Sequence, residues 1–247
     1  MNNVSGPALT PLLDFVDCSQ EQDLSDRGVE NAVNAANVVS MVQIDFTEHT
    51  VPLAYRIWCR GIDIVFSLCG MFILFILLLL LAPLMMLDSP GPIFYYQERM
   101  GYRGKSFRII KLRSMRLDAE LAGKAVWATK HDSRVTRIGR FLRATHLDEL
   151  PQVINILRSE MSLIGPRPER EEYARELERT HSAYRMRSLV KPGLTGLAQV
   201  NYGYGDSSKS EVEKLQYDLF YIQRRSIALD VLILWKTIGE VVGGHGI

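Results

Sequence analysis

Cysteine is scarce in this sequence, and the few cysteines are not spaced to cross-link the chain. The 247 residues contain three of them, Cys18, Cys59 and Cys69. The number is odd and no two have the short spacing of a zinc-binding pair, so neither a disulfide framework nor a structural zinc site is indicated. A reducing, cytoplasmic setting fits this usage best.

Three common catalytic signatures are also missing. The sequence has no GxxxxGK[ST] phosphate loop, no GxSxG nucleophile turn and no HExxH metal helix. Their absence argues against P-loop nucleotide hydrolases, α/β-hydrolases and zinc proteases. The histidines are scattered, and only His146 lies near the adjacent acidic residues Asp148 and Glu149. We interpret His146 as a packing or orienting residue rather than as a general base.

Basic residues are almost absent from the first fifty positions. Residues 1–50 hold one basic residue, Arg27, and eight acidic residues, a net charge of −7. The rest of the chain has 28 basic and 20 acidic residues, a net charge of +8. We predict a disordered, acidic cytoplasmic tail over 1–50. The basic remainder suits an anionic substrate or membrane surface, with an ordinary solvated face as the alternative on charge alone.

Charge is missing altogether from residues 64–87, a run of 24 residues. With a rise of about 1.5 Å per residue, a helix of this length extends about 36 Å and is long enough to cross a bilayer. The run is not a secretory signal peptide, because it begins after residue 60 and follows an acidic stretch. A buried core helix is the soluble alternative, but a small domain rarely surrounds so uniformly apolar a helix.

The basic residues on both sides of this run favour one topology. Arg56 and Arg60 precede it, and five basic residues follow it within the next 24 positions. The preference of basic loops for the cytoplasm therefore draws both flanks to the same side. We predict a re-entrant membrane helix with an amphipathic lead-in over 51–88, with Pro83 as a possible break. Because Pro83 comes late in the run, a full span stays open.

The remaining segments predict a mainly α fold with a small β-hairpin, an α+β class. Residues 93–97 and 107–112 have the composition of strands, and residues 101–105 form the turn between them. Helical spacing is found at 134–142, 152–157, 169–181 and 211–223. The apolar stretch 227–235 is too short to span a membrane. It either lies in the membrane interface with Trp235 at headgroup level or packs in the core.

Two adjacent carboxylates form the densest chemical motif. Asp148 and Glu149 stand just before Pro151, a residue that favours the first turn of a helix. Free N–H groups and the dipole at a helix N-terminus attract phosphate and favour ionised carboxylates, which can act as nucleophiles or metal ligands. The alternative is that Asp148 merely caps the helix and Glu149 is solvated.

A second motif follows one helix length later. Arg167 lies between Pro166 and Pro168, and the prolines fix the backbone that presents it. A guanidinium held in this way is suited to bidentate phosphate binding. The glycine-rich segment 191–200 can bring backbone amides close to a nucleotide, although by itself it is only a loop. With the lysine-bearing hairpin, these motifs predict phosphoryl-group transfer rather than acyl transfer.

With these motifs in place, the chain from about Arg56 to its end resembles the bacterial sugar transferases. These are monotopic phosphoglycosyl transferases that begin the assembly of surface polysaccharides on a polyprenyl carrier. The segment around residues 202–221 further resembles the subgroup that makes exopolysaccharide and capsule. The motifs that carry the resemblance lie at 88–92, 97–99, 107–115, 132–139, 147–152, 161–168 and 191–200.

The resemblance implies a specific reaction. A UDP-sugar gives its sugar-1-phosphate to undecaprenyl phosphate, UMP is released, and Mg²⁺ is required. Asp148 is the expected nucleophile and forms an aspartyl-phosphosugar intermediate, and Asp148 with Glu149 is the expected metal site. The residues expected to bind phosphate or nucleotide sugar are Lys111, Arg113, Arg143, Arg167, Gly196 and Gln199.

The resemblance also implies a location and a set of partners. Residues 89–247 are expected to form a cytoplasmic phosphoglycosyl transferase domain on the inner membrane of a bacterium. The expected partners are a UDP-sugar, undecaprenyl phosphate and membrane lipid, with no nucleic acid. Glucose or galactose is favoured, and an N-acetylated sugar, a homodimer and polysaccharide-assembly proteins stay open. Family members usually break the membrane helix with Ser-Pro, where this sequence has Phe75-Ile76.

Two other functions compete with the transferase. The first is a non-catalytic, membrane-anchored scaffold of a polysaccharide assembly complex, which would have no need of the pair Asp148 and Glu149. The second is a hydrolase of lipid diphosphates, in which water takes the place of polyprenyl phosphate as the acceptor.

Overall fold

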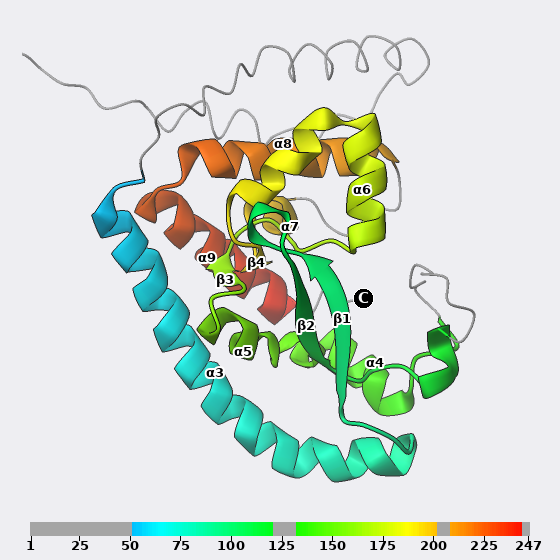
Figure 1. The fold of residues 1–247 in the computed structure, drawn as a ribbon. Helices are drawn as coiled ribbons and strands as arrows, with labels where there is room; N and C mark the ends of the chain where they lie inside the picture. The colour runs from blue at the N-terminus through cyan, green and yellow to red at the C-terminus, as the bar shows by residue number, and fades with distance from the viewer. Residues whose placement is uncertain (1–50, 121–131, 202–207, 244–247) are drawn as a thin grey trace, which may run out of the picture. The chain divides into compact units, whose positions relative to one another are not determined.

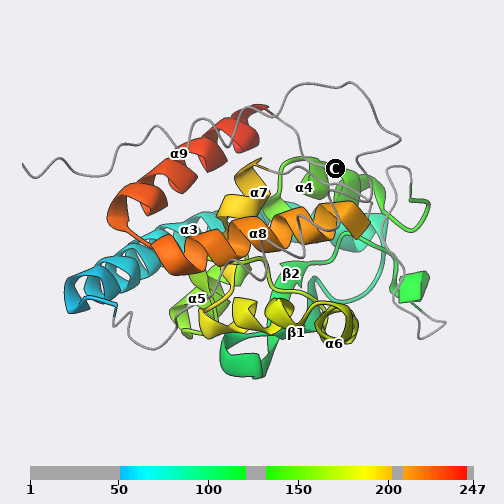
Figure 2. The ribbon, with the colours of Figure 1, turned by 90° about the horizontal axis from the view of Figure 1, so that it is seen from above.

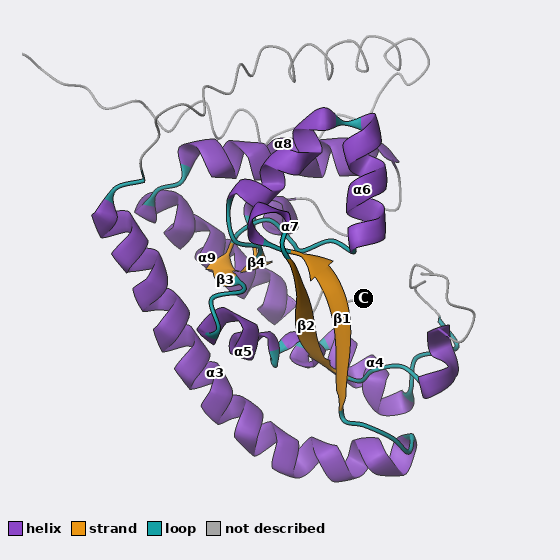
Figure 3. Ribbon diagram, viewed as in Figure 1, coloured by secondary structure: helices purple, strands orange, loops and turns teal. Residues whose placement is uncertain are grey.

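The computed structural model describes residues 51–120, 132–201 and 208–243, and the predicted acidic tail at 1–50 lies outside the described residues. Helices account for most of this part of the chain (Figures 1 and 3). The helices and strands are α3 (Leu53–Asp88), β1 (Phe94–Met100), β2 (Ser106–Leu112), α4 (Arg137–Ala144), α5 (Gln152–Leu157), β3 (Ser162–Ile164), α6 (Glu171–Thr180), β4 (Gly193–Thr195), α7 (Leu197–Asn201), α8 (Ser208–Arg224) and α9 (Ile227–Gly243).

The predicted β-hairpin is confirmed. Strands β1 and β2 pair antiparallel, with Phe94 opposite Leu112 and Met100 opposite Ser106. The turn between them is the short helical turn η1 (Tyr102–Gly104). Ile109, Ile110 and Leu112 of β2 are buried, whereas none of the β1 side chains is buried to that degree. The hairpin therefore attaches to the rest of the molecule through β2.

A second, parallel strand pair was not predicted. Strand β3 pairs with β4, with Ser162 opposite Gly193 and Ile164 opposite Thr195. Each strand is three residues long, too short to show the alternation that identifies a strand in sequence. The glycines allow the backbones to approach, since a Cβ at Gly193 would lie 2.1 Å from the nitrogen of Gly165.

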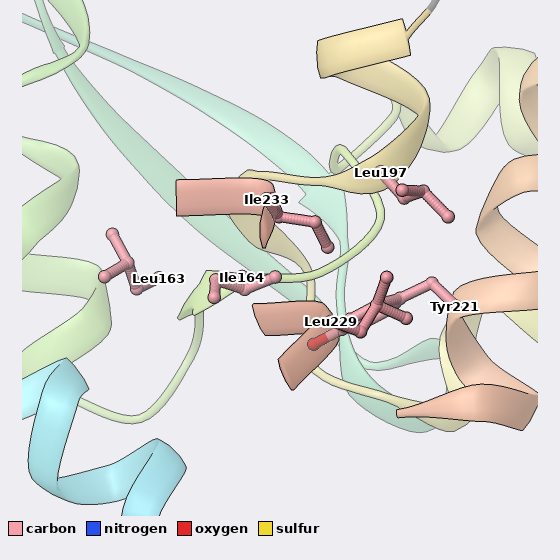
Figure 4. Packing of buried hydrophobic residues seen from close by; sticks show 6 residues of the cluster. All are labelled: Leu163, Ile164, Leu197, Tyr221, Leu229 and Ile233. Atoms are coloured by element: carbon pink, nitrogen blue, oxygen red, sulfur yellow. The ribbon is translucent and has the colours of Figure 1, made fainter. Parts of the chain in front are cut away.

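One hydrophobic cluster joins this strand pair to the C-terminal helices. Its buried members come from β3, α7, α8 and α9 and pack together (Figure 4). Seen from above, α7 lies against both α8 and α9 (Figure 2). The labelled residues are Leu163, Ile164, Leu197, Tyr221, Leu229 and Ile233.

Helix α9 has one side packed in the core and one side exposed. Leu229 and Ile233 face the core, which confirms core packing for one side. On the other side Val231 and Trp235 are 51% and 74% exposed. The helix is also longer than the predicted stretch 227–235 and runs to Gly243.

Helix α3 is a continuous helix of 36 residues that curves around the domain (Figure 1). The break expected at Pro83 is wrong, because the helix continues through this residue to Asp88. Leu78, Leu81 and Met85, on both sides of Pro83, pack in one cluster with Leu112 and Leu142. This shared packing holds the helix together where the proline removes a backbone donor. The helix is long and apolar enough to cross a membrane.

Polar contacts fasten both ends of α3 to the same domain. Near its start, the Arg60 guanidinium donates to the carbonyl oxygens of Ile156 and Leu157, both at 2.9 Å. Three residues later, the Asp63 carboxylate accepts from the backbone N–H of Leu163 at 2.7 Å.

At the other end, the Asp88 carboxylate accepts from the N–H of Ile138 at 2.9 Å, at the start of α4. Between the two ends, Gly70 permits close approach, since a Cβ there would lie 2.7 Å from a methyl carbon of Val153 in α5. The apolar run therefore lies along the domain from one end to the other.

Candidate active site

A sharp reversal between α4 and α5 presents the two carboxylates. Helix α4 ends at Ala144, and His146 then takes the left-handed conformation, with φ 56° and ψ 14°, which is uncommon for a residue other than glycine. One short turn, η3 (Leu147–Glu149), follows and leads into α5. Pro151 stands at the N-terminal end of α5, as predicted. Leu147 packs against the cluster of Met85, Leu112 and Leu142, which fixes the turn against α3, β2 and α4.

Glu149 joins three separate parts of the chain. Its Oε1 lies 2.7 Å from Lys111 Nζ of β2 and 2.7 Å from Arg167 Nη2 of the turn after β3. A second contact joins Arg167 Nη1 to Oε2 at 3.4 Å. Burial alone would raise the pKa of Glu149, but the charges and hydrogen bonds of Arg167 and Lys111 hold it well below its usual range. Glu149 is therefore ionised and shared between two cations.

Asp148 has a different environment from its neighbour. It is 8% exposed, and its carboxylate has no hydrogen-bond partner among the residues that the structure describes. Burial raises the pKa of Asp148, the negative charge of Glu149 adds to this effect, and the charges of Lys111, Arg143 and His146 oppose it. A carboxylate that is surrounded by cations but not tied to one of them remains available to react.

Arg143 reaches the site from the last turn of α4. Its Nε donates to Ser114 Oγ at 2.9 Å, and its charge acts on Asp148. The helix lies unusually close to Ser114, because a Cβ at Gly139 would be 1.9 Å from the Ser114 carbonyl oxygen. This close packing sets the distance between α4 and the segment after β2.

Three of the predicted binding residues have other contacts in the structure. Arg113 is buried and donates to the carbonyl oxygens of Pro90, at 3.1 Å, and of Ser89, at the end of α3. Gln199 Nε2 donates to the Leu194 carbonyl at 3.1 Å. A Cβ at Gly196 would lie 2.2 Å from the Gly165 carbonyl oxygen, so packing requires glycine there. In the described part of the chain, no hydrogen bond or ion pair joins these residues to Asp148 or Glu149.

A residue that the sequence analysis did not single out holds Lys111 in place. Asn155 of α5 is fully buried, and its amide bonds to the free edge of β2. Its Oδ1 accepts from Ile110 N–H at 3.1 Å, and its Nδ2 donates to the Arg108 carbonyl at 2.8 Å and to Glu160 Oε2 at 2.7 Å. The Asn155 amide thus makes the backbone hydrogen bonds that a neighbouring strand would make. It fixes β2, and with it Lys111, against α5. The only signal in the sequence is a polar residue within the apolar run 153–157.

The carboxylates fit a magnesium ion only together with a substrate. No group of three or more His, Cys, Asp or Glu side chains that could hold a metal is found among the described residues. Mg²⁺ is, however, commonly held by one or two carboxylates and the phosphates of its substrate. Asp148 and Glu149 supply such a donor set, provided that Glu149 exchanges part of its contact with Lys111 and Arg167.

Comparison with known proteins identifies the family. Residues 54–244 match the bacterial sugar transferase family, so the chain belongs to it, as the motifs indicated.

Several named proteins are similar to this chain. A UDP-N-acetylgalactosamine-undecaprenyl-phosphate N-acetylgalactosaminephosphotransferase of Aeromonas hydrophila is 41% identical over 187 residues, covering 76% of this chain and 44% of that protein. A UDP-glucose:undecaprenyl-phosphate glucose-1-phosphate transferase of Xanthomonas campestris pv. campestris is 43% identical, covering 68% of this chain and 35% of that protein. The exopolysaccharide production protein PSS of Rhizobium leguminosarum bv. phaseoli is 37% identical, covering 76% of this chain and 96% of that protein. The chain therefore spans less than half the length of the first two relatives.

The role of Asn155 leads to a first prediction. Asn155→Asp keeps the acceptor for Ile110 N–H but loses the donor to the Arg108 carbonyl and places a carboxylate beside Glu160. Leaving a buried carbonyl unpaired costs about 1–3 kcal/mol, so the thermal unfolding midpoint in detergent should fall clearly.

Asn201→Asp is the matched control, because it also loses a donor to a carbonyl, that of Leu197 at 2.9 Å, but at a half-buried site where Oδ1 already accepts from Lys236 Nζ at 2.5 Å. It should change the midpoint much less. Equal midpoints for Asn155→Asp and the unmodified protein would show that the amide does not hold the hairpin.

Proposed function

We propose that this protein is a phosphoglycosyl transferase that moves sugar-1-phosphate from a UDP-sugar to undecaprenyl phosphate and releases UMP. The observation that carries the proposal is the buried Asp148 carboxylate, which has no hydrogen-bond partner among the described residues and lies beside Glu149, the partner of Lys111 and Arg167. The relatives from Aeromonas and Xanthomonas are named for transfers to undecaprenyl phosphate, one with an N-acetylated sugar and one with glucose. We keep a UDP-hexose as the expected donor.

The reaction proceeds in two displacements at one phosphorus atom. The Asp148 carboxylate attacks the β-phosphorus of the UDP-sugar, the bond from this phosphorus to the bridging oxygen breaks, and UMP leaves. A phosphate oxygen of the lipid then attacks the same phosphorus and releases Asp148. The product is a lipid diphosphate that carries the sugar. Dividing one transfer into two steps in this way is the usual benefit of a carboxylate nucleophile.

The cations that now hold Glu149 are suited to the donor diphosphate. Lys111 and Arg167 both bind phosphate oxygens well, and Arg167 can do so with two parallel hydrogen bonds. A diphosphate that takes these contacts would displace Glu149, and Asp148 and Glu149 are the residues that would hold Mg²⁺. Bound Mg²⁺ would neutralise part of the diphosphate charge. Glu149 therefore keeps the two cations in place until the substrate replaces it.

We further propose that α3 is re-entrant and that the domain lies on the cytoplasmic face of the inner membrane. Arg60 and Asp63 at one end of the helix and Asp88 at the other bond to the same folded domain. A single domain cannot lie on both sides of a bilayer, so both helix ends belong to one side. The outer side of the helix exposes apolar residues such as Val65, Phe72 and Leu79, which suits contact with lipid tails.

The reaction can be tested by measuring UMP release from purified protein in detergent. A panel of UDP-sugars is supplied with Mg²⁺, with and without polyprenyl phosphate. We expect multiple turnovers with one class of sugar and only in the presence of the lipid. Asp148→Asn should lower the rate by at least about 10³-fold, because the nucleophile is lost.

Glu98→Gln serves as the matched control, since it also neutralises a carboxylate, but an exposed one on β1 that is not part of the proposed site, and it should leave the rate unchanged. Continued turnover without lipid would indicate water as the acceptor and hence a hydrolase. Folded protein that releases no UMP with any sugar would favour the scaffold.

The topology can be tested with single cysteines in a background that lacks Cys18, Cys59 and Cys69. Arg56→Cys and Lys105→Cys place exposed thiols before and after the apolar run. We expect a membrane-impermeant maleimide to label both only after the inner membrane is opened. Labelling of one position in intact spheroplasts would establish a full span.

A further inference from the structure

A buried arginine outside the proposed chemistry bonds to the backbone of Arg167. Arg187 lies in the helical turn η4 (Ser182–Leu189), and its side chain is 12% exposed. Its Nε lies 2.7 Å from Asp218 Oδ2 of α8, and the Asp218 side chain is 2% exposed. Its Nη2 donates to the carbonyl oxygen of Arg167 at 3.1 Å, and its Nη1 donates to the Tyr184 hydroxyl. The guanidinium therefore connects α8 to the turn that presents Arg167.

This turn is held at every carbonyl from residue 166 to residue 169. The four donors come from three parts of the fold, β4, η4 and the end of β1, and two of them are arginine side chains. The contacts are Gly193 N–H to Pro166 O at 2.9 Å, Arg187 Nη2 to Arg167 O at 3.1 Å, Arg99 Nη1 to Pro168 O at 3.1 Å and Met100 N–H to Glu169 O at 3.0 Å.

Of these four hydrogen bonds, the one from Arg187 is made to the carbonyl oxygen of Arg167. When a diphosphate displaces Glu149, Arg167 exchanges its contacts with that carboxylate for contacts with phosphate, and its backbone anchor remains. An arginine with a fixed backbone loses less conformational freedom on binding its ligand. Asp218 is needed for this anchor, because an unpaired guanidinium would be costly to bury.

We propose that Arg187 and Asp218 form a positioning pair that aligns Arg167 for the diphosphate of the nucleotide donor. This inference rests on the proposed function, in which Arg167 binds that diphosphate. A purely structural ion pair would stabilise the packing of α8 without acting on Arg167. The two roles differ in whether the effect of Arg187 on nucleotide binding depends on the Arg167 side chain.

A double-mutant cycle separates these roles. Arg187→Lys keeps a cation for Asp218 but lacks the planar fork that also reaches the Arg167 carbonyl. Binding of UDP in the presence of Mg²⁺ is measured by calorimetry for the full chain in detergent, with Arg187→Lys, Arg167→Ala and the double variant. We expect Arg187→Lys to weaken UDP binding about tenfold alone and less than about twofold in the Arg167→Ala background, a coupling typical of residues that act together.

Arg60→Lys is the matched control. Arg60 also donates from its guanidinium to two backbone carbonyls, but those of Ile156 and Leu157, so any effect should be the same in both backgrounds. Asp218→Asn is the second variant of the pair. It leaves Arg187 in place and can replace Arg187→Lys in the cycle if that variant does not fold. Its effect on UDP binding should depend on the Arg167 side chain in the same way.

The possible results are distinct. An equal loss of UDP affinity from Arg187→Lys, or from Asp218→Asn, in both backgrounds would overturn the positioning role and leave the proposed function standing. If the single variant Arg167→Ala binds UDP as tightly as the unmodified protein, Arg167 does not bind the diphosphate. This result would also refute the positioning role of Arg187 and Asp218.

Discussion

The candidate site depends on a carboxylate shared between two cations that come from distant parts of the chain. Burying Glu149, Lys111 and Arg167 is costly unless their charges are close and well aligned. Much of the surrounding structure can be understood as providing that alignment. Asn155 fixes the edge of β2 and therefore Lys111, and the bonds to the turn at 166–169 fix Arg167. Asp148 lies beside this cluster, and no described residue donates a hydrogen bond to its carboxylate.

The apolar helix belongs to this arrangement and is more than an anchor. The residues of α3 that contact the domain include Asp63 near its start, Gly70 at its middle and Met85 near its end. Met85 packs with Leu147, the residue before Asp148. The position of the helix in a membrane would therefore set the depth of Asp148 directly. This is the geometry needed by an enzyme whose one substrate is soluble and whose other substrate is a lipid.

Local signals made parts of this structure predictable. The hairpin followed from two strand-like runs around a turn, and Pro151 marked the start of α5. The strands β3 and β4 gave no such signal, because three residues are too few to show a period. The pairing of Arg187 with Asp218, 31 positions apart, depends on how α8 packs against η4. The break expected at Pro83 was wrong because tertiary packing outweighed the local effect of proline. The expectation that Arg113 binds phosphate came from the family resemblance, and the contacts of Arg113 with the carbonyl oxygens after α3 depend on tertiary packing that the sequence does not show.

The most direct test of the account is whether Asp148 becomes covalently modified. The protein is incubated with Mg²⁺ and the UDP-sugar that it uses, without polyprenyl phosphate, and its intact mass is measured. We predict that the mass of the protein increases by one phosphosugar group and that peptide mapping locates this group on Asp148. The increase should be absent in Asp148→Asn and should disappear when polyprenyl phosphate is added. An enzyme that releases UMP rapidly with lipid present, yet carries no adduct at any time when lipid is withheld, would contradict the account and indicate direct transfer between the two substrates.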